Sequence, residues 1–337
     1  MNSTQNQMAE MLREFKSRSQ AKVVLESGLY MLVLLFLLFG NSLTLLVMLL
    51  NRQMRTIPNM FVTSLALSDL LTGILTAGPL SLPALVTSQW PFNNTACQFQ
   101  GIIVITLNVA SIYTLCLMAV NRYYRIVKPS RYQRYFTKKK AMIMILSTWF
   151  YSICCGPLPF VLSGHKMVFY PSKFFCFYPV ENSAFTAFGI PLYMGIPTCV
   201  TLYCYFRIFT TVRNHNRNFH LSGNPISSVN VQDVKVVRTI FVIVLFYNLC
   251  WIPVVFVHFV DTIYERLAFP REVYVAKTFL LTISSAFNPV IYGVLNKSFR
   301  KNYVNVLRCT CCRAGAVVAP LPLRRRATVA AMSGTIA

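Results

Sequence analysis

The sequence predicts an all-α membrane protein, a seven-transmembrane helix bundle with a short amphipathic helix after the seventh span. Two observations predict this class. The windows between Glu26 and Arg52 and between Lys140 and Lys166 each contain 25 residues without a charge, and about 20 mostly apolar residues cross the hydrocarbon of a bilayer. Only 12% of the 337 residues are charged, about half the fraction usual in a soluble domain. We therefore expect one membrane domain.

The predicted spans divide the chain into four regions. The spans are 27–51, 58–86, 94–126, 140–162, 184–212, 233–260 and 272–295. We expect an N-terminal tail over 1–26 without a cleavable signal peptide, a membrane domain over 27–295, a membrane-surface helix with a cysteine cluster over 296–312 and a disordered tail over 313–337. Asp69 is the one charge inside the second span, and a lone intramembrane carboxylate indicates a functional site.

Basic residues lie mostly in alternate loops. The net charge is +23, and the first, third and fifth loops contain 15 Lys and Arg residues. The second, fourth and sixth loops contain five, among which we count Lys277, and eight more follow the last span. The positive-inside rule therefore predicts a plasma-membrane protein with its N-terminus outside and its C-terminus in the cytoplasm. The charge requires no nucleic-acid partner.

Cysteine and glycosylation signals agree with this orientation. Of eleven cysteines, only Cys97 and Cys176 fall on the outer side, where disulfides persist. They predict one bridge between the third span and the second outer loop, and two free thiols are the alternative. Asn2 and Asn93 occupy glycosylation sequons on the same side, whereas the sequon at Asn296 is cytoplasmic and should be silent.

The segment after the seventh span predicts a helix on the inner leaflet, in contact with membrane lipids. Phe299, Tyr303, Val306 and Leu307 share one helical face, which is typical of a surface-lying amphipathic helix. Three cysteines follow and are candidates for palmitoylation: Cys309, Cys311 and Cys312. The alternative is an unmodified cysteine-rich turn.

Short motifs, one in each span, occur in a fixed order. They are Gly40-Asn41-Ser42, Leu65-Ala66-Leu67-Ser68-Asp69, Asn121-Arg122-Tyr123, Trp149, Pro197 with Tyr205, Cys250-Trp251-Ile252-Pro253 and Asn288-Pro289-Val290-Ile291-Tyr292. From about residue 27 to residue 312 the chain resembles the rhodopsin-like (class A) G-protein-coupled receptors. This resemblance implies a receptor that binds an extracellular ligand and activates a heterotrimeric G protein, without catalytic residues.

Within that family the framework resembles the melatonin-receptor-like branch. Asn121 replaces the usual acid before Arg122, as in that branch, whereas Pro289 departs from it. The polar residues expected to hold melatonin are replaced here by Pro159, Val180 and Tyr193. We therefore expect kinship in the framework and a different ligand.

The resemblance places Arg122 at the cytoplasmic end of the third span and Asp233 at the foot of the sixth. A guanidinium partly out of water needs an acceptor, so an Arg122–Asp233 pair would hold the G-protein cleft shut. Opening would release Arg122 toward Tyr205 and Tyr292. The alternative is an arginine that extends to the lipid phosphates.

The resemblance also surrounds Asp69 with polar side chains. These are Asn41, Ser111, Ser284, Ser285 and Asn288. Their oxygens suit a hydrated sodium ion. This sodium would act as an allosteric ligand, and it is the one ion that we expect. A protonated Asp69 within a hydrogen-bond network is the alternative. Pro253 and Pro289 should kink their helices, with Trp251 as the sensor at the pocket floor or, alternatively, a plain packing residue.

By the family's register, eleven residues line the ligand pocket. They are Val104, Ile105, Asn108, Tyr193, Trp251, Val254, Val255, His258, Tyr274, Thr278 and Thr282. Val104 stands where aminergic receptors carry an aspartate, and Thr282 stands where opsins carry a lysine. We expect a neutral or weakly polar, lipophilic ligand, with His258 as the only ionisable group inside.

Other classes of membrane protein agree less well with the sequence. A transporter or channel tends to have broken helices in matching halves and ionisable residues along a path, and neither pattern is evident. A non-retinal opsin relative that signals constitutively is a further alternative. An enzyme is not expected, because the histidines are scattered: His165, His215, His220 and His258.

Overall fold

The outer surface of the helical bundle is apolar. In the computed structural model, Phe150, Phe206 and Leu249 are 71%, 63% and 60% exposed, whereas Asp69 and Asn288 are buried. Helices that face lipid have this distribution, because each helix satisfies its own backbone polar groups. The structure describes residues 3–158, 164, 166–179, 189, 191–222, 231–264 and 266–315.

Helices coincide with the seven predicted spans in the described part of the chain. Five are α2 (Gln20–Leu50), α5 (Asn94–Val127), α7 (Lys138–Cys155), α9 (Ile196–Ser222) and α10 (Val231–Ile263). Four described helices are long and apolar enough to cross a membrane, and one bent pair makes a fifth. The spans predicted at α7 and α9 extend into residues 159–162 and 184–188, which lie outside the described residues.

The second helix is interrupted by a π-helical segment. It comprises α3 (Ile57–Thr72), η2 (Gly73–Ser81) and α4 (Leu82–Thr87). Pro79 lies within η2, and because proline has no N–H, the backbone widens around it.

The seventh helix is bent. It comprises α11 (Arg271–Ala286) and α12 (Asn288–Leu295), which meet at 42°. Pro289 lies in the first turn of α12, so the predicted kink at this proline is confirmed.

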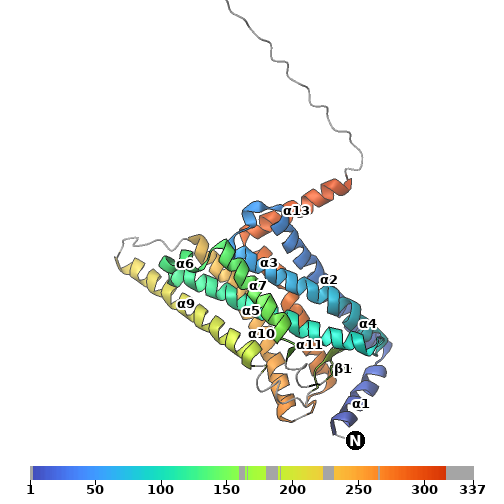
Figure 1. Cartoon of the computed structure of the whole chain (residues 1–337). Coiled ribbons are helices and arrows are strands. Elements are labelled where there is room, and N and C mark those ends of the chain that lie inside the picture. The colour runs from blue at the N-terminus through green and yellow to red at the C-terminus, as the bar shows by residue number, and fades with distance from the viewer. Residues whose placement is uncertain are drawn as a thin grey trace, which may run out of the picture.

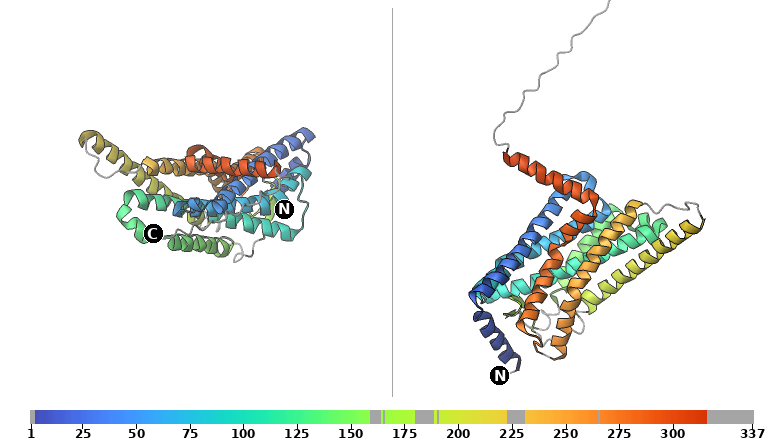
Figure 2. Two further views of the ribbon diagram at one scale, coloured as in Figure 1. Left: turned by 90° about the horizontal axis from the view of Figure 1, so that it is seen from above. Right: turned by 180° about the vertical axis from the view of Figure 1, so that it is seen from behind.

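Short elements cover both ends of the bundle (Figure 1). One end, here called the disulfide end, carries α1 (Ser3–Lys16) and a hairpin of β1 (Val168–Tyr170) and β2 (Phe175–Phe177), in which Phe169 pairs with Cys176. No helix was expected over α1. The opposite end, here called the α13 end, carries α6 (Pro129–Tyr135) and α13 (Lys297–Gly315). Figure 2 shows α13 leaving the bundle far from the N-terminus.

The helix α5 lies at the centre of the bundle and contacts α3, α7, α9 and α10. The largest buried cluster includes Leu65, Met118, Tyr205, Ile243 and Tyr292. Because the same cluster includes residues of α13, it lies toward the α13 end. Tight packing there leaves the larger cavities nearer the disulfide end.

Candidate functional site

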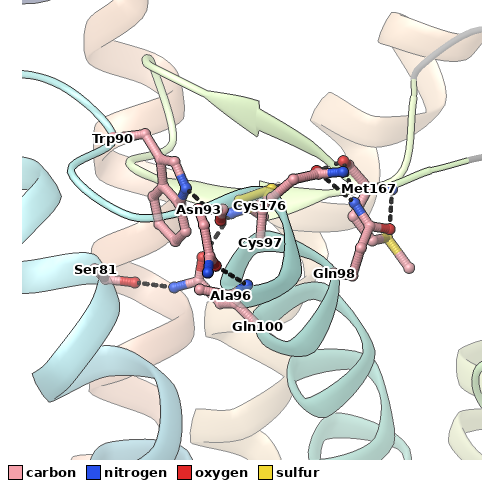
Figure 3. The surroundings of a disulfide bond; sticks show 10 residues. Ser81, Trp90, Asn93, Ala96, Cys97, Gln98, Gln100, Met167 and Cys176 are labelled. Carbon is pink, nitrogen blue, oxygen red and sulfur yellow. Dashed lines mark hydrogen bonds between the residues drawn. A yellow bond between two sulfur atoms is a disulfide. The ribbon is translucent and has the colours of Figure 1, made fainter.

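A disulfide and two glutamines fasten the hairpin to the first turns of α5 (Figure 3). Cys97 and Cys176 form the predicted bridge, which is confirmed. The Gln98 amide accepts a hydrogen bond from the Met167 N–H at 2.8 Å and donates one to the Met167 carbonyl at 2.9 Å. The Gln100 amide oxygen accepts from the Cys176 N–H at 2.8 Å. These contacts hold the hairpin across the disulfide end.

Next to the hairpin lies an apolar cavity with an empty volume of about 680 Å³, which includes space open to solvent. Phe175, Phe177 and Tyr178 line it from the hairpin side. Eight of the eleven predicted pocket residues also line it: Val104, Ile105, Asn108, Tyr193, Trp251, Val254, Val255 and His258. The lining is therefore mostly apolar and aromatic, which suits a lipophilic molecule.

The other three predicted pocket residues do not line this cavity. Thr278 and Thr282 line a smaller cavity of about 450 Å³, together with Tyr30. Tyr274 is fully buried, and its hydroxyl donates a 2.5 Å hydrogen bond to Asp261. Tyr274 therefore acts in packing and in holding a carboxylate.

Lys277 also lines the cavity, although the charge count placed it in a loop. It lies within α11 and is 3% exposed. The prediction that His258 is the only ionisable group in the pocket is therefore wrong. The charge of Lys277 ended the uncharged window, but the helix already begins at Arg271. Hydropathy contains no signal that distinguishes a buried lysine from a loop lysine.

A second cavity, with an empty volume of about 1000 Å³, adjoins the first. Its lining includes Ile252 and Phe256 of α10, which are 62% and 59% exposed on the outer surface. The two cavities share Ile112, Met194, Trp251 and Val255. The pocket thus continues toward the apolar, lipid-facing side of α9 and α10.

Asp69 lies in a buried polar cluster. It is 1% exposed, accepts a 2.8 Å hydrogen bond from the Asn288 amide and is also bonded by the Ser285 side chain. Asn41 donates to the Ser285 carbonyl at 3.2 Å, and its own amide oxygen has no partner among the described residues. The cluster therefore joins the first, second and seventh helices of the bundle, and the Asn41 amide oxygen is free to accept a further hydrogen bond from a group outside the described residues.

Two predicted neighbours of Asp69 bond elsewhere. Ser111 is 2.8 Å from the Ser68 hydroxyl, and Ser284 donates to the Leu281 carbonyl at 2.7 Å. The structure brings Asn41, Ser285 and Asn288 together with Asp69, and Ser111 and Ser284 would have to rotate to join them.

Buried polar groups continue from the cavity toward the α13 end. Trp251 lines the cavity and stacks on Tyr247, with ring centroids 5.3 Å apart. Tyr247 and Tyr292 lie within electrostatic range of Asp69, and Tyr205 lies within that of Arg122. Four of these side chains have a buried polar atom without a partner in the described part of the chain: Trp251, Tyr247, Tyr292 and Tyr205. Because such an atom costs about 1–3 kcal/mol, new hydrogen bonds would stabilise a rearranged state.

Arg122 is buried in the last turns of α5, at the α13 end. Its neighbour Asn121 donates a 3.3 Å hydrogen bond to the Tyr132 hydroxyl, which ties α5 to α6. Asp233 lies in the first turn of α10, but its side chain is outside the described residues. The Arg122–Asp233 pair therefore stays a prediction.

An ion-pair network at the disulfide end was missed by the sequence reasoning. Glu26 accepts from Arg18 at 2.5 Å and from Arg271 at 2.9 and 2.6 Å. Arg18 also donates to the Leu85 carbonyl at 2.6 Å and to Ser88 at 2.8 Å. Glu26 and Arg271 lie beside span boundaries and Arg18 lies in the N-terminal tail, so the sequence contains no signal for their pairing. The network fastens the segment after α1 to α2, α4 and α11.

The helix α13 packs much of its apolar face against the bundle. Phe299 stacks on Tyr292 with centroids 5.1 Å apart, and the Tyr303 hydroxyl is 2.7 Å from that of Thr44. Leu307 is 39% exposed, so only the farther part of the face is available to lipid. The side chains of the three candidate cysteines, Cys309, Cys311 and Cys312, lie outside the described residues. Asn2, Pro159 and Val180 also lie outside them.

Residues 40–292 match the family described as 7 transmembrane receptor (rhodopsin family). The chain is 28% identical to melatonin receptor type 1B-B of Danio rerio over 272 residues, which are 80% of this chain and 77% of the relative. It is 27% identical to melatonin receptor type 1C of Gallus gallus over 272 residues, with the same two shares. It is 26% identical to melatonin receptor type 1A of Phodopus sungorus over 274 residues, 80% of this chain and 76% of the relative.

The matched region contains the disulfide, the cavity and the Asp69 cluster, and it confirms the predicted seven-helix fold. Its family consists of receptors that act through a ligand and a heterotrimeric G protein. The chain therefore belongs to the rhodopsin family of seven-transmembrane receptors, the class A G-protein-coupled receptors, and is related to the melatonin-receptor branch.

Proposed function

We propose that this receptor converts binding of an extracellular lipophilic ligand into opening of α10 and activation of a heterotrimeric G protein. The observation that carries the proposal is the apolar cavity next to the hairpin, because four of its lining residues belong to α10. A ligand in this cavity contacts the helix that has to move. The polar lining is sparse, which supports a lipophilic ligand.

The pivot of this movement would be Pro253. It lies inside α10, between the cavity residues Trp251 and Val254. Proline removes one backbone hydrogen bond, so a helix bends most easily there. A ligand that displaces Trp251 would swing the half of α10 that contains Asp233.

At the α13 end, the Arg122–Asp233 pair would hold α5 and α10 together in the inactive state. Breaking a buried ion pair costs about 3–5 kcal/mol when one charge loses its partner. The hydroxyls of Tyr205 and Tyr292, which have hydrogen-bonding capacity to spare, would offset this cost by accepting from Arg122.

The polar cluster around Asp69 fits a hydrated sodium ion as an inhibitory ligand. Sodium would supply the positive charge that a carboxylate in this buried site needs. Asp69, Ser285 and the unpartnered amide oxygen of Asn41 would hold it, since oxygen donors suit hard cations. Movement of α12 would displace Asn288 and change the shape of this cluster.

The orientation belongs to the same proposal. The disulfide end would face outside, with Asn93, the N-cap of α5, and Asn2 as glycosylation sites. The α13 end would face the cytoplasm, with α13 on the inner leaflet and palmitate on the cysteines after Arg308. The excess of basic residues in the loops of this end supports the assignment.

Sensors for each Gα subtype, expressed with the receptor in cells, test the proposal. At matched surface expression, the wild type should activate at least one subtype, either basally or with a library of lipophilic compounds, and Arg122→Ala should lose that response. Arg131→Ala, on the exposed surface of α6, is the matched control and should respond normally. A wild type that reaches the surface and activates no subtype would contradict the proposal.

A further inference from the structure

We infer that the ligand is a lipophilic organic anion, a carboxylate on an apolar body, whose acid group pairs with Lys277 in the cavity. This inference rests on the proposed function, because it takes the cavity to be the ligand site. It narrows the ligand from any lipophilic molecule to an acidic one.

The amino group of Lys277 is buried within the cavity lining, and no described residue hydrogen-bonds to it. The residue is 3% exposed and lines the apolar cavity, and its Nζ has no hydrogen-bond partner among the described residues. A buried charge is costly unless it is paired and hydrogen-bonded. Such costly groups are retained at functional sites, and an ammonium has three donors to offer an anion.

Among the described residues, one acidic group and one further basic group act on Lys277. Asp261 and Lys173 both lie within electrostatic range of it. One oxygen of Asp261 accepts from the Tyr274 hydroxyl and from the Ala268 N–H, and its other oxygen has no hydrogen-bond partner in the described part of the chain.

Lys173 brings a second buried cation to the same region. Its Nζ lies over the rings of Tyr170 and Tyr274, at 4.1 and 5.4 Å from their centroids, and such stacking partly stabilises an ammonium. In the part of the chain that the structure describes, two lysines therefore face one aspartate, one basic group more than acidic. A monoanionic ligand would complete the balance.

The remaining lining explains why the anion should be lipophilic. His258 is the other ionisable residue in the described lining, and it stacks on Tyr178 within reach of a 3.4 Å hydrogen bond. All other contacts that the cavity offers are aromatic or aliphatic, apart from Asn108. The second cavity continues past Trp251 to the lipid-facing surface of α10, so an acyl or aryl body has a route toward the membrane.

Thermal unfolding of the purified receptor in lipid nanodiscs tests the inference without a G protein. The probes are carboxylates of 8 to 20 carbons, each paired with its methyl ester and its alcohol. We expect at least one carboxylate to raise the Tm in a concentration-dependent and saturable way. Its methyl ester should bind at least tenfold more weakly. Oleyl phosphate, a phosphate monoester, is compared with oleate, and stronger stabilisation by the phosphate would contradict a carboxylate ligand.

Variants assign the effect to the lysine. Lys277→Met should abolish the carboxylate-induced rise in Tm, and Lys277→Arg should retain it. Lys22→Met removes a charge from the same end but outside the cavity, where Lys22 pairs with Glu272 at 2.7 Å, and should bind like the wild type. Without ligand, Lys277→Met should also raise the Tm, because it removes an unpaired buried charge.

Three results would overturn the inference. Esters could stabilise as well as acids in every pair, or Lys277→Met could bind carboxylates normally. Alternatively, Lys277→Met and Glu181→Gln could lower the Tm by equal and non-additive amounts. That result would mean that Glu181, which lies outside the described residues, already neutralises the lysine. These Tm measurements contain no G protein, so they test the ligand class alone. Nucleotide exchange on the G protein tests the proposed function separately.

Discussion

The Asn288 amide donates a hydrogen bond of 2.8 Å to the Asp69 carboxylate. Asn288 is the first residue of α12, immediately after the 42° bend in the seventh helix. The bond therefore connects the intramembrane acid to the point at which that helix changes direction. Any movement of α12 alters the surroundings of Asp69, and any ligand of Asp69 resists the movement.

The first prediction follows from this connection. Raising sodium at constant ionic strength, with a bulky organic cation as replacement, should lower basal nucleotide exchange on the coupled G protein by about fivefold, a typical allosteric coupling. Asp69→Asn keeps the side-chain shape, removes the charge and should abolish the sodium effect. An exchange rate independent of sodium in the wild type would instead support a protonated Asp69 held by hydrogen bonds alone.

The second prediction concerns the hairpin. Cys97→Ser and Cys176→Ser should each reduce surface expression strongly, because losing a native disulfide costs about 2–5 kcal/mol and frees the hairpin from α5. Cys199→Ser, at an exposed free cysteine of α9, is the matched control and should have no effect. Flow cytometry of intact cells measures all three, and normal expression of both bridge variants would refute the prediction.

The third prediction concerns the network around Glu26. Glu26→Gln leaves Arg18 and Arg271, whose side chains are 1% and 0% exposed, without an anion. We expect the free energy of unfolding to fall by about 3 kcal/mol. Glu272→Gln breaks the exposed pair with Lys22, whose partners are 59% and 39% exposed, and should cost less than about 1 kcal/mol. Thermal unfolding measures both variants. Equal decreases in Tm would show that burial of the Glu26 network adds nothing to the stability of the receptor.

The fourth prediction concerns pH. Burial lowers the pKa of Lys173, in the turn of the hairpin, to about 8, although attraction by Asp261 acts in the opposite direction. In the unfolded chain a lysine titrates near pH 10.4, so between these values the unfolded state binds more protons and stability rises with pH. Below about pH 8 the full cost of the buried charge is present.

Lys173→Met removes this titration. The difference in Tm between the variant and the wild type should therefore change between about pH 8 and pH 10, with the wild type gaining stability as pH rises. Below pH 8 the difference should be constant. A difference independent of pH over the whole range would contradict the lowered pKa.

Much of the fold could be predicted because lipid imposes one rule. A stretch such as 27–51, without a charge, can only cross the membrane as a helix, and α2 covers all but its last residue. The rule contains no information about segments outside the lipid. The helix α1 and the pairing of Phe169 with Cys176 depend on contacts with the bundle, so neither could be predicted.

The candidate site was predictable where a position in a helix decides the role. Val104 and His258 face the cavity because their helices have one inward face. Lys277 could not be assigned in this way, because a charge counts against burial in every hydropathy argument. The partners of Glu26 were also unpredictable, since ion pairs between residues 245 positions apart depend on tertiary structure.

Under the proposed function, opening of α10 at Arg122 activates a G protein. Nucleotide exchange on purified Gα subunits, driven by the purified receptor in nanodiscs, tests it most directly. Asp233→Asn should raise basal exchange about tenfold, which corresponds to about 1.4 kcal/mol, and Arg122→Ala should abolish exchange at an unchanged Tm. Exchange that is unaffected by both substitutions would show that the Arg122–Asp233 pair does not control activation.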